Sequence, residues 1–363
     1  MKISEILQAI EEYAPLHLQE QWDNAGVQVG DVSHEATGAL LCVDVTEAII
    51  NEAVERGINL VISHHPLLFR GLKRITGNSA VERIVATALK HDIVVYSAHT
   101  NMDSTLGGVS WATGRIVGLT HMRTLVPQPA QTMKLSVFVP VANSRTVSEA
   151  IWAAGAGQMG NYDQCAYMVD GRGTFRPLDG AHPAIGEIGS NHTENETRIE
   201  VVFPASKCAR VVQAMLAAHP YEEPAFDLVR LENMAATGLG VIGELETPMS
   251  ATDYIAFVKK SLSIGAIPYV GDATRVIRRV ALCGGAGAEF IGTAIAQGAD
   301  LYMCGDLKYH DFTTHCDRIV LANIGHYESE QCTKGIFYDI IQKKFPNFAT
   351  YYADQDKNPI SYG

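Results

Sequence analysis

The feature that most constrains the fold is an alternation of short apolar runs with amphipathic helical patterns near both ends of the 363-residue chain. Apolar runs that predict buried strands occupy residues 39–45, 60–63, 93–97, 276–283, 300–304 and 319–324. Helical patterns cover residues 4–13, 45–56, 79–91 and 289–297. Strands that are buried on both faces and joined through helices are typical of parallel sheets. The sequence therefore predicts an α/β fold with a mostly parallel sheet.

The pattern changes in the middle of the chain. Residues 127–131 (PQPAQ) have the composition of a linker. The segment that follows predicts the order strand, helix, strand, strand, helix, strand, which is typical of a ferredoxin-like module. We therefore predict a discontinuous α/β domain made of residues 1–125 and 236–363. Residues 126–235 are predicted to form an inserted α+β module.

Two adjacent histidines follow one of the predicted strands. The apolar residues 60–62 lead into Ser63, His64 and His65, and Pro66 ends the run. Functional side chains of α/β folds gather at the carboxyl ends of strands. Adjacent side chains on a strand point to opposite faces, so His64 and His65 do not easily share one ion. At the end of a strand, each could instead serve a different ion of a close pair.

Such a pair needs ligands from elsewhere in the chain. His99 and Asp103 follow the next predicted strand, and His326 and Glu330 follow the last one. The four-residue spacing of His326 and Glu330 places them on one face of either a helix or a strand. Alone, each has a plainer explanation, such as a solvated ion pair on a helix or a turn residue. Together with His64 and His65 they favour a metal site.

The predicted ligand set suggests its chemistry. His64, His65, Asp103, His326 and Glu330 supply mixed nitrogen and oxygen ligands, which suit zinc, iron, manganese or cobalt. Five ligands serve two ions only if one carboxylate bridges them and open positions hold water. Open positions are what hydrolytic chemistry needs.

Other polar residues near the predicted strand ends are candidates for supporting roles. His99 and His310 are candidates for acid/base catalysis or for orienting a ligand, with a hydrogen-bonded core histidine as the alternative. Arg70 and Lys73 follow the histidine pair and could hold an anionic substrate, or they could simply belong to a solvated loop.

Two further motifs carry weaker signals. The turn at residues 284–287 (GGAG) could cradle a phosphate, but it lacks the dinucleotide and P-loop fingerprints, so a packing turn is favoured. In the inserted module, residues 219–224 (HPYEEP) predict a rigid turn or a small-ligand surface.

Composition narrows the class of protein. The hydrophobic content of 47% and the formal net charge of -12, without a basic stripe, fit a folded protein and argue against nucleic-acid binding. Small anionic substrates stay compatible with a local cationic pocket. We find no run of about 18 apolar residues that would span a membrane and no signal peptide. Seven cysteines without a CxxC pair predict a reduced, cytoplasmic protein and make a cysteine-ligated zinc site improbable.

Five separated segments resemble one known family. They are residues 22–30 (WDNAGVQVG), 63–71 (SHHPLLFRG), 98–103 (AHTNMD), 305–310 (GDLKYH) and 325–330 (GHYESE). In these segments the chain resembles the Nif-three-like dinuclear-metal hexameric family, whose members are labelled GTP cyclohydrolase 1 type 2 homologues. Residues 155–162 and 219–224 are similar to its longer members, which carry an inserted PII/CutA-like module.

The resemblance implies a ligand assignment and an assembly. It implies two divalent metal ions per subunit, one bound by His65 and Asp103, the other by His64 and His326, with Glu330 bridging. It also implies a ring-like homohexamer whose metal sites face an internal cavity. The resemblance defines the site much better than the substrate.

Two functions follow as hypotheses. The first is a metal-dependent hydrolase that acts on a nucleotide-like or phosphorylated small molecule, similar to GTP cyclohydrolase or to a phosphoesterase. The second is a non-enzymatic metal-binding regulator or adaptor, with the PII-like module as a small-molecule sensor. Metal storage is a weaker third hypothesis, because five ligands hold few ions.

Overall fold

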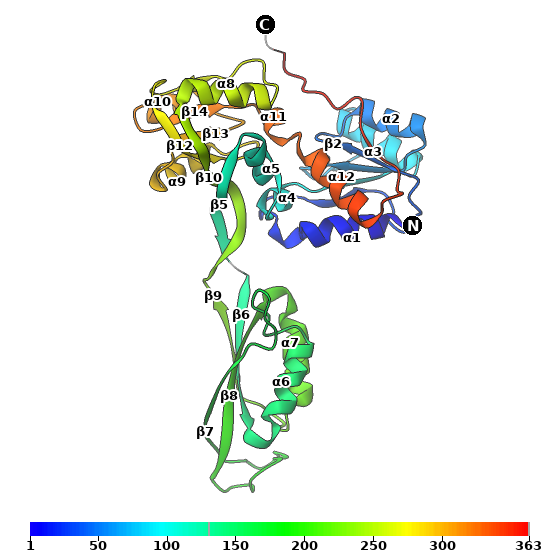
Figure 1. The fold of residues 1–363 in the computed structure, drawn as a ribbon. Coiled ribbons are helices and arrows are strands. Elements are labelled where there is room, and N and C mark those ends of the chain that lie inside the picture. Colours follow the sequence, from blue (N-terminus) through cyan, green and yellow to red (C-terminus); the bar gives the residue numbers. More distant parts are fainter. Residues whose placement is uncertain (130, 362–363) are drawn as a thin grey trace. The chain divides into compact units, whose positions relative to one another are not determined.

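The computed structural model describes residues 1–129 and 131–361, and the chain packs as two compact units. Unit 1 consists of Met1–Gln128 and Ala236–Gly363, and unit 2 of Pro129–Ala235 (Figure 1). No helix in the described part of the chain has the length and apolar character needed to cross a bilayer.

The first sheet of unit 1 is built mainly from the N-terminal half of the chain. Its strand order is β1-β4-β3-β2-β15. The strands are β1 (Gly26–Val29), β2 (Ala39–Cys42), β3 (Leu60–Ser63), β4 (Val94–Ser97) and β15 (Thr350–Tyr352). β15, β2, β3 and β4 are parallel, and β1 is antiparallel to β4. The predicted parallel strands are therefore present, with a C-terminal strand at one edge.

Helices cover both faces of this sheet (Figure 1). α1 (Ile3–Tyr13) and α12 (Thr333–Lys344) share one core cluster with the sheet, while α2 (Glu47–Arg56) and α3 (Ala80–Lys90) pack in another. As predicted, Thr46 caps α2 by accepting the N–H of Ile49, and Gly57 ends it with φ of 64°. Local capping chemistry thus sets where α2 begins and ends.

The second sheet of unit 1 comes mainly from the C-terminal half. Its order is β11-β14-β13-β12-β10-β5. The strands are β5 (Leu119–Pro129), β10 (Met234–Ser250), β11 (Tyr269–Val270), β12 (Val276–Leu282), β13 (Leu301–Cys304) and β14 (Val320–Asn323). β12, β13 and β14 are parallel, whereas β10 pairs antiparallel with β12, and β11 antiparallel with β14. α8 (Ala251–Ser261) and α9 (Ile291–Ala296) pack in separate core clusters with this sheet, and α10 (Tyr309–His315) follows β13.

Two details of the sequence-based fold are corrected. Unit 1 contains two sheets instead of one mostly parallel sheet, because the long strands β5 and β10 extend the second sheet with only partly buried residues that give no continuous apolar run. Residues 127–129, predicted to be linker, form the end of β5. Residue 130 of that predicted linker lies outside the described residues.

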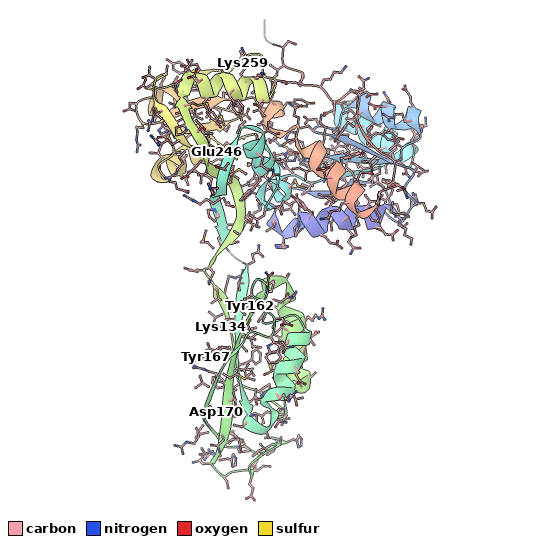
Figure 2. The ribbon with its side chains drawn as sticks, in the orientation of Figure 1. Lys134, Tyr162, Tyr167, Asp170, Glu246 and Lys259 are labelled. Atoms are coloured by element: carbon pink, nitrogen blue, oxygen red, sulfur yellow. The ribbon has the colours of Figure 1, made fainter. Side chains whose placement is uncertain are left out.

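Unit 2 has the predicted element order. It runs β6 (Thr132–Pro140), α6 (Ser144–Ala153), β7 (Tyr167–Phe175), β8 (His192–Pro204), α7 (Cys208–Ala218) and β9 (Phe226–Leu231). The sheet order is β7-β8-β6-β9, and each described pairing is antiparallel. α6 and α7 cover one face, and their core cluster includes Val137, Ile199 and Met215. Tyr167 and Asp170 lie on the edge strand β7 (Figure 2).

Candidate metal centre

His64 and His65 directly follow β3, at the carboxyl end of the first sheet. The ring of His64 is fully buried, and its Nδ1 donates to the carbonyl oxygen of Ala98 at 3.0 Å. His65 donates from Nδ1 to Asp44 Oδ1 at 2.9 Å. Because each Nδ1 is already bonded, each Nε2 is the nitrogen left to face the cluster.

Glu330 lies between the two histidines. It stands at the end of α11 (His326–Glu330), a short helix entered through Gly325, whose φ is 76°. Glu330 Oε2 lies 3.0 Å from His65 Nε2 and 3.1 Å from His326 Nε2, while Oε1 lies 3.6 Å from His64 Nε2. One carboxylate therefore faces imidazoles from both sheets.

Asp103 completes the set of five residues that the sequence predicts as ligands. It lies on α4 (Thr100–Ser104), just after β4, and its Oδ1 is 3.7 Å from His64 Nε2. On the other side of Glu330, the Nε2 atoms of His65 and His326 are 3.3 Å apart. The structure thus pairs His64 with Asp103 and His65 with His326. The family resemblance implies the other pairing, His65 with Asp103 and His64 with His326. The rings of His64 and His65 nevertheless lie close together, with centroids 5.0 Å apart.

The cluster contains polar atoms that lack partners. Among the described residues, His64 Nε2 and Asp103 Oδ1 are buried without a hydrogen bond, and the buried Oε2 of Glu330 has only the Nε2 atoms of His65 and His326 beside it, at 3.0 and 3.1 Å. Leaving such atoms unsatisfied costs free energy, unless a bound group compensates for it. In the part of the chain that the structure describes, two groups have ligand atoms close enough to hold a metal ion. One is His64, His65 and His99, and the other is His65, His326 and Glu330. The donor set therefore fits a cation.

Protonation of the cluster follows from burial and charge. Burial lowers the pKa of His64. Burial also opposes protonation of His65, but its hydrogen bonds to Asp44 and Glu330 outweigh this and raise its pKa to about 10. The hydrogen bond to Glu330 raises the pKa of His326 to about 9. A metal ion must therefore displace protons from these two imidazoles, so metal binding should tighten as pH rises.

The two carboxylates of the cluster differ. Burial raises the pKa of Asp103 well above its usual range, and the negative charge of Glu330 adds to the rise. Burial also disfavours the ionised form of Glu330, yet the surrounding imidazoles, His64 foremost, hold its pKa well below the usual range. Glu330 is therefore the permanent anion of the cluster.

Three carboxylates that orient the imidazoles are not among the predicted site residues. Asp44 bonds His65, and Asp306 bonds Nδ1 of His326 at 2.9 Å. Asp23 Oδ1 accepts from Nδ1 of His99 at 2.8 Å. Burial disfavours ionisation of Asp23, but hydrogen bonds from His99 and Thr100 lower its pKa to about 2. Asp44 lies near the end of the apolar run 39–45, and Asp306 stands two residues after the run 300–304, which is the signal that could have identified them.

The turn at residues 284–287 supports the cluster. Gly285 adopts φ of 60°, and a β-carbon there would overlap Oε1 of Glu330. Its N–H donates to Ser329 Oγ at 2.9 Å, next to Glu330. The favoured interpretation as a packing turn agrees with these contacts, and the packing partner is the ligand cluster.

Of the remaining predicted site residues, His99 adjoins the five-residue cluster and the others lie outside it. His99 faces His64 and His65, with ring centroids 5.3 and 5.4 Å away. His310 is exposed at the start of α10, and no hydrogen bond or ion pair among the described residues links its ring to the cluster. Arg70 and Lys73 are exposed in the loop after β3, next to Phe69, whose ring lies 6.5 Å from that of His99.

The fold and the site define a mixed α/β protein with a buried histidine–carboxylate cluster at the carboxyl ends of parallel strands. The family described as Duf34/NIF3 (NGG1p interacting factor 3) matches residues 1–359, and the chain belongs to this family.

Similar proteins cover almost the whole chain. A Bacillus subtilis (strain 168) protein named GTP cyclohydrolase 1 type 2 homolog is 36% identical, over 99% of this chain and 98% of that protein. The protein of the same name from Halalkalibacterium halodurans is 39% identical over 91% of this chain and 90% of its own length. A solved Bacillus cereus protein related to NIF3 superposes with a TM-score of 0.81 at 34% identity, covering 100% of this chain and 99% of that one. A Staphylococcus aureus protein gives a TM-score of 0.85 at 28% identity, with the same coverage.

Proposed function

We propose that the cluster holds two divalent metal ions and that the protein is a metal-dependent hydrolase. His64 and Asp103 would serve one ion, and His65 and His326 the other, with one oxygen of Glu330 directed to each. The observation that carries this proposal is the pair of buried atoms on His64 and Asp103 that no described residue hydrogen-bonds, both next to the carboxylate of Glu330. Zinc, iron and manganese all suit such mixed ligands.

The support around the imidazoles strengthens the proposal. His64, His65 and His326 each use Nδ1 to donate to an oxygen. This fixes the tautomer of the neutral ring and leaves the lone pair of Nε2 available to a metal ion. A structural histidine in a core has no need for a second imidazole and two carboxylates at its other nitrogen. The convergence therefore favours a ligand role.

Hydrolysis is the chemistry that we propose for this site. When bound, a pair of divalent ions supplies Lewis acidity and lowers the pKa of water. His99, held by Asp23, is placed to take up and return a proton at Nε2. Arg70 and Lys73, both exposed after β3, would attract the anionic part of a substrate. The name of the relatives, GTP cyclohydrolase 1 type 2 homolog, supports a nucleotide-like or phosphorylated substrate.

The first experiment is to measure metal content. Protein that has been repleted separately with zinc, iron and manganese and then desalted should retain about two ions per chain. The metal-loaded protein is then offered GTP and generic phosphoesters. If the protein retains metal but turns over none of these compounds, the hydrolase proposal is contradicted and the metal site is supported. If the protein retains no metal, both the metal site and the hydrolase proposal are contradicted.

A metal-binding regulator or adaptor is the second candidate. It is favoured by the fact that all cluster residues belong to unit 1, while unit 2 is compact and has its own cavity. We propose that unit 2 is a PII/CutA-like module that acts as a sensor, on the basis of its strand order. If this is right, a small molecule that binds unit 2 should change metal affinity, which calorimetry with and without that molecule would measure.

We also propose the ring-like homohexamer that the family resemblance implies. Exposed apolar side chains of unit 1, including Trp22, Phe69 and Ile75, are the kind of surface that assembly covers. Light scattering should give six times the chain mass of 39.3 kDa. A mass equal to one chain would contradict the hexamer.

A further inference from the structure

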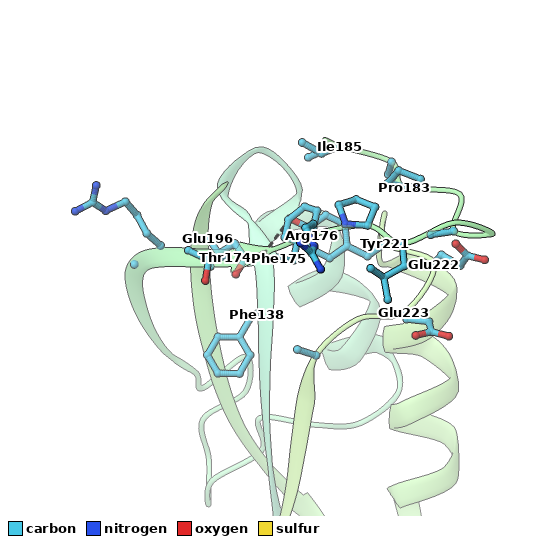
Figure 3. A pocket seen from close by; sticks show the side chains of 18 of the residues that line it. Phe138, Thr174, Phe175, Arg176, Pro183, Ile185, Glu196, Tyr221, Glu222 and Glu223 are labelled. Atoms are coloured by element: carbon cyan, nitrogen blue, oxygen red, sulfur yellow. Dashed lines mark hydrogen bonds between the residues drawn. The ribbon is translucent and has the colours of Figure 1, made fainter. Parts of the chain in front are cut away.

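Unit 2 contains a cavity of about 900 Å³ that the proposed hydrolase chemistry does not use. It is bordered by the end of β7, the loop that follows β7, and the turn at residues 219–224 (Figure 3). A cavity of this size accommodates a small organic molecule. The turn is the HPYEEP segment that the sequence singles out.

His219 makes this turn rigid. Its buried ring donates from Nε2 to the carbonyl oxygen of Phe138 at 2.9 Å and accepts at Nδ1 from the N–H of Tyr221 at 3.1 Å. Both ring nitrogens are therefore used in the neutral form. The loop after β7 is tied to the same turn, because Glu222 Oε2 accepts the N–H of His182 at 2.8 Å. His219 and Glu222 thus position the cavity wall. Both ring nitrogens of His219 and one carboxylate oxygen of Glu222 are already used in hydrogen bonds within the protein.

Glu196 is the polar group at the buried side of the cavity. It is only 8% exposed, although it carries a carboxylate. Oε1 accepts from the hydroxyl of Tyr221 at 3.0 Å, and no described residue donates a hydrogen bond to Oε2. A buried carboxylate without a counter-charge is costly. Glu196 therefore has unused acceptor capacity directed at the cavity.

Gly173 makes room for this carboxylate. A β-carbon at Gly173 would overlap Oε2 of Glu196, whereas one at Gly171, two residues earlier on β7, would meet nothing within 4 Å. Gly173 has no left-handed φ that would itself require glycine. Glycine is therefore needed at position 173 because any side chain there would occupy the space of the Glu196 carboxylate.

Aromatic and charged groups complete the wall. The rings of Phe175 and Tyr221 lie 5.8 Å apart beside Glu196 (Figure 3). Five carboxylate side chains and three guanidinium side chains line the cavity, so its balance is negative. Arg172 and Arg176 are exposed and form no ion pair with any described residue. Glu196 therefore suits a cationic or N–H-rich group, and the exposed guanidinium of Arg176 suits an anionic group.

We propose that this cavity binds a small molecule that presents a planar, guanidinium-type N–H edge to Glu196 and an anionic group to Arg176. Two adjacent N–H donors match the two oxygens of a carboxylate, and the flat group packs on aromatic rings. The same edge occurs on free guanidinium compounds, such as L-arginine, and on guanine nucleotides. The site lies wholly in unit 2 and does not depend on metal in unit 1.

Calorimetry on the full chain tests the proposal. L-arginine is compared with L-citrulline, in which a neutral urea replaces the guanidinium, and GMP with IMP, which lacks the amino group. We expect one member of each pair, L-arginine or GMP, to bind about tenfold or more tightly than its control. Preference for L-arginine identifies a free guanidinium ligand, and preference for GMP a nucleotide. Absence of binding by both at millimolar concentration, or equal binding of a probe and its control, overturns the proposal.

Variants place the binding in this cavity. Glu196→Gln keeps the shape and removes the charge, and Gly173→Ala displaces the carboxylate; each should weaken binding by about tenfold or more. Gly171→Ala adds the same methyl group on the same strand and should bind like wild type. If Gly173→Ala fails to fold, Glu196→Gln alone decides. Unchanged affinity in Glu196→Gln overturns the assignment.

Discussion

His65 and His326 are separated by 261 positions in the sequence, yet their Nε2 atoms lie 3.3 Å apart. At the opposite ring nitrogen, Nδ1, each imidazole donates a hydrogen bond to an aspartate, His65 to Asp44 and His326 to Asp306. The two imidazoles come from different sheets, and Glu330 Oε2 lies within 3.1 Å of both. Two nitrogens and a carboxylate oxygen in this arrangement need a shared cation, and either protons or a metal ion can provide it.

Removing one imidazole should remove one metal ion. We expect His326→Ala to retain about one ion per chain and Glu330→Ala almost none, since only Glu330 faces both halves of the cluster. His310→Ala is the matched control, because His310 is exposed on α10 and should leave the metal content unchanged. Elemental analysis of desalted protein measures this. Two ions retained by either ligand variant would refute the assignment.

The orienting aspartates should matter for affinity more than for stoichiometry. In Asp44→Asn and Asp306→Asn the imidazole loses its charged acceptor, and we expect metal affinity to fall about 10–100-fold. Competition against a fluorescent chelator measures the change. Asp317→Asn, an exposed aspartate of the same unit, should have wild-type affinity. Identical affinity in all three variants would show that the aspartates do not support the ligands.

Gly285→Ala should disturb the site through Glu330. The added methyl group overlaps Oε1 of Glu330, and φ of 60° disfavours alanine by about 1–2 kcal/mol. We expect weaker metal retention and a lower free energy of unfolding in urea. Gly292→Ala in α9 adds a methyl group with nothing within 4 Å and should leave both properties unchanged or slightly improve stability. Full metal retention by Gly285→Ala would contradict the role of this turn.

Asp23 should make stability depend on acid pH. Its pKa is about 2 in the fold, against an ordinary value of 3.8 for an aspartate, so its contribution to stability is present above pH 4 and lost as pH falls towards 2. The shift corresponds to about 2 kcal/mol at neutral pH. In metal-free protein, Asp23→Asn should therefore lose stability at pH 6, and the difference from wild type should shrink to roughly half at pH 3. Urea unfolding at both pH values tests this, and a pH-independent difference would argue against it.

Local sequence patterns predict much of the first half of the fold. The range of β3 is predicted to the residue, and the cap of α2 at Thr46 is predicted correctly. Such features depend on neighbours in the chain, because apolar periodicity and capping act within one or two turns. Strand ends are equally local, and therefore His64, His65, Asp103, His326 and Glu330 could be singled out as candidates before any contact was known.

Other features depend on contacts that no local pattern encodes. β1 and β15 are short strands that join the sheet through partners distant in sequence, and β5 and β10 are only partly buried. The family resemblance does not give the pairing of His64 with Asp103, since this depends on how α4 and α11 approach β3. The contact of Asp23 with His99 spans 76 positions. His310 has the same residue type and a similar position after a strand, but α10 leaves it exposed.

The sequence by itself determined which segments become strands and helices and which side chains stand at their ends, because those choices follow from short-range periodicity and capping. Only the tertiary structure decided that two sheets meet with their strand ends together, that Glu330 faces both groups of imidazoles, and that Gly173 leaves room for Glu196 in unit 2. These relationships arise from packing between elements that are far apart in the chain. The free energy that stabilises these contacts comes from the packing of the whole folded core, so no short stretch of sequence predicts them.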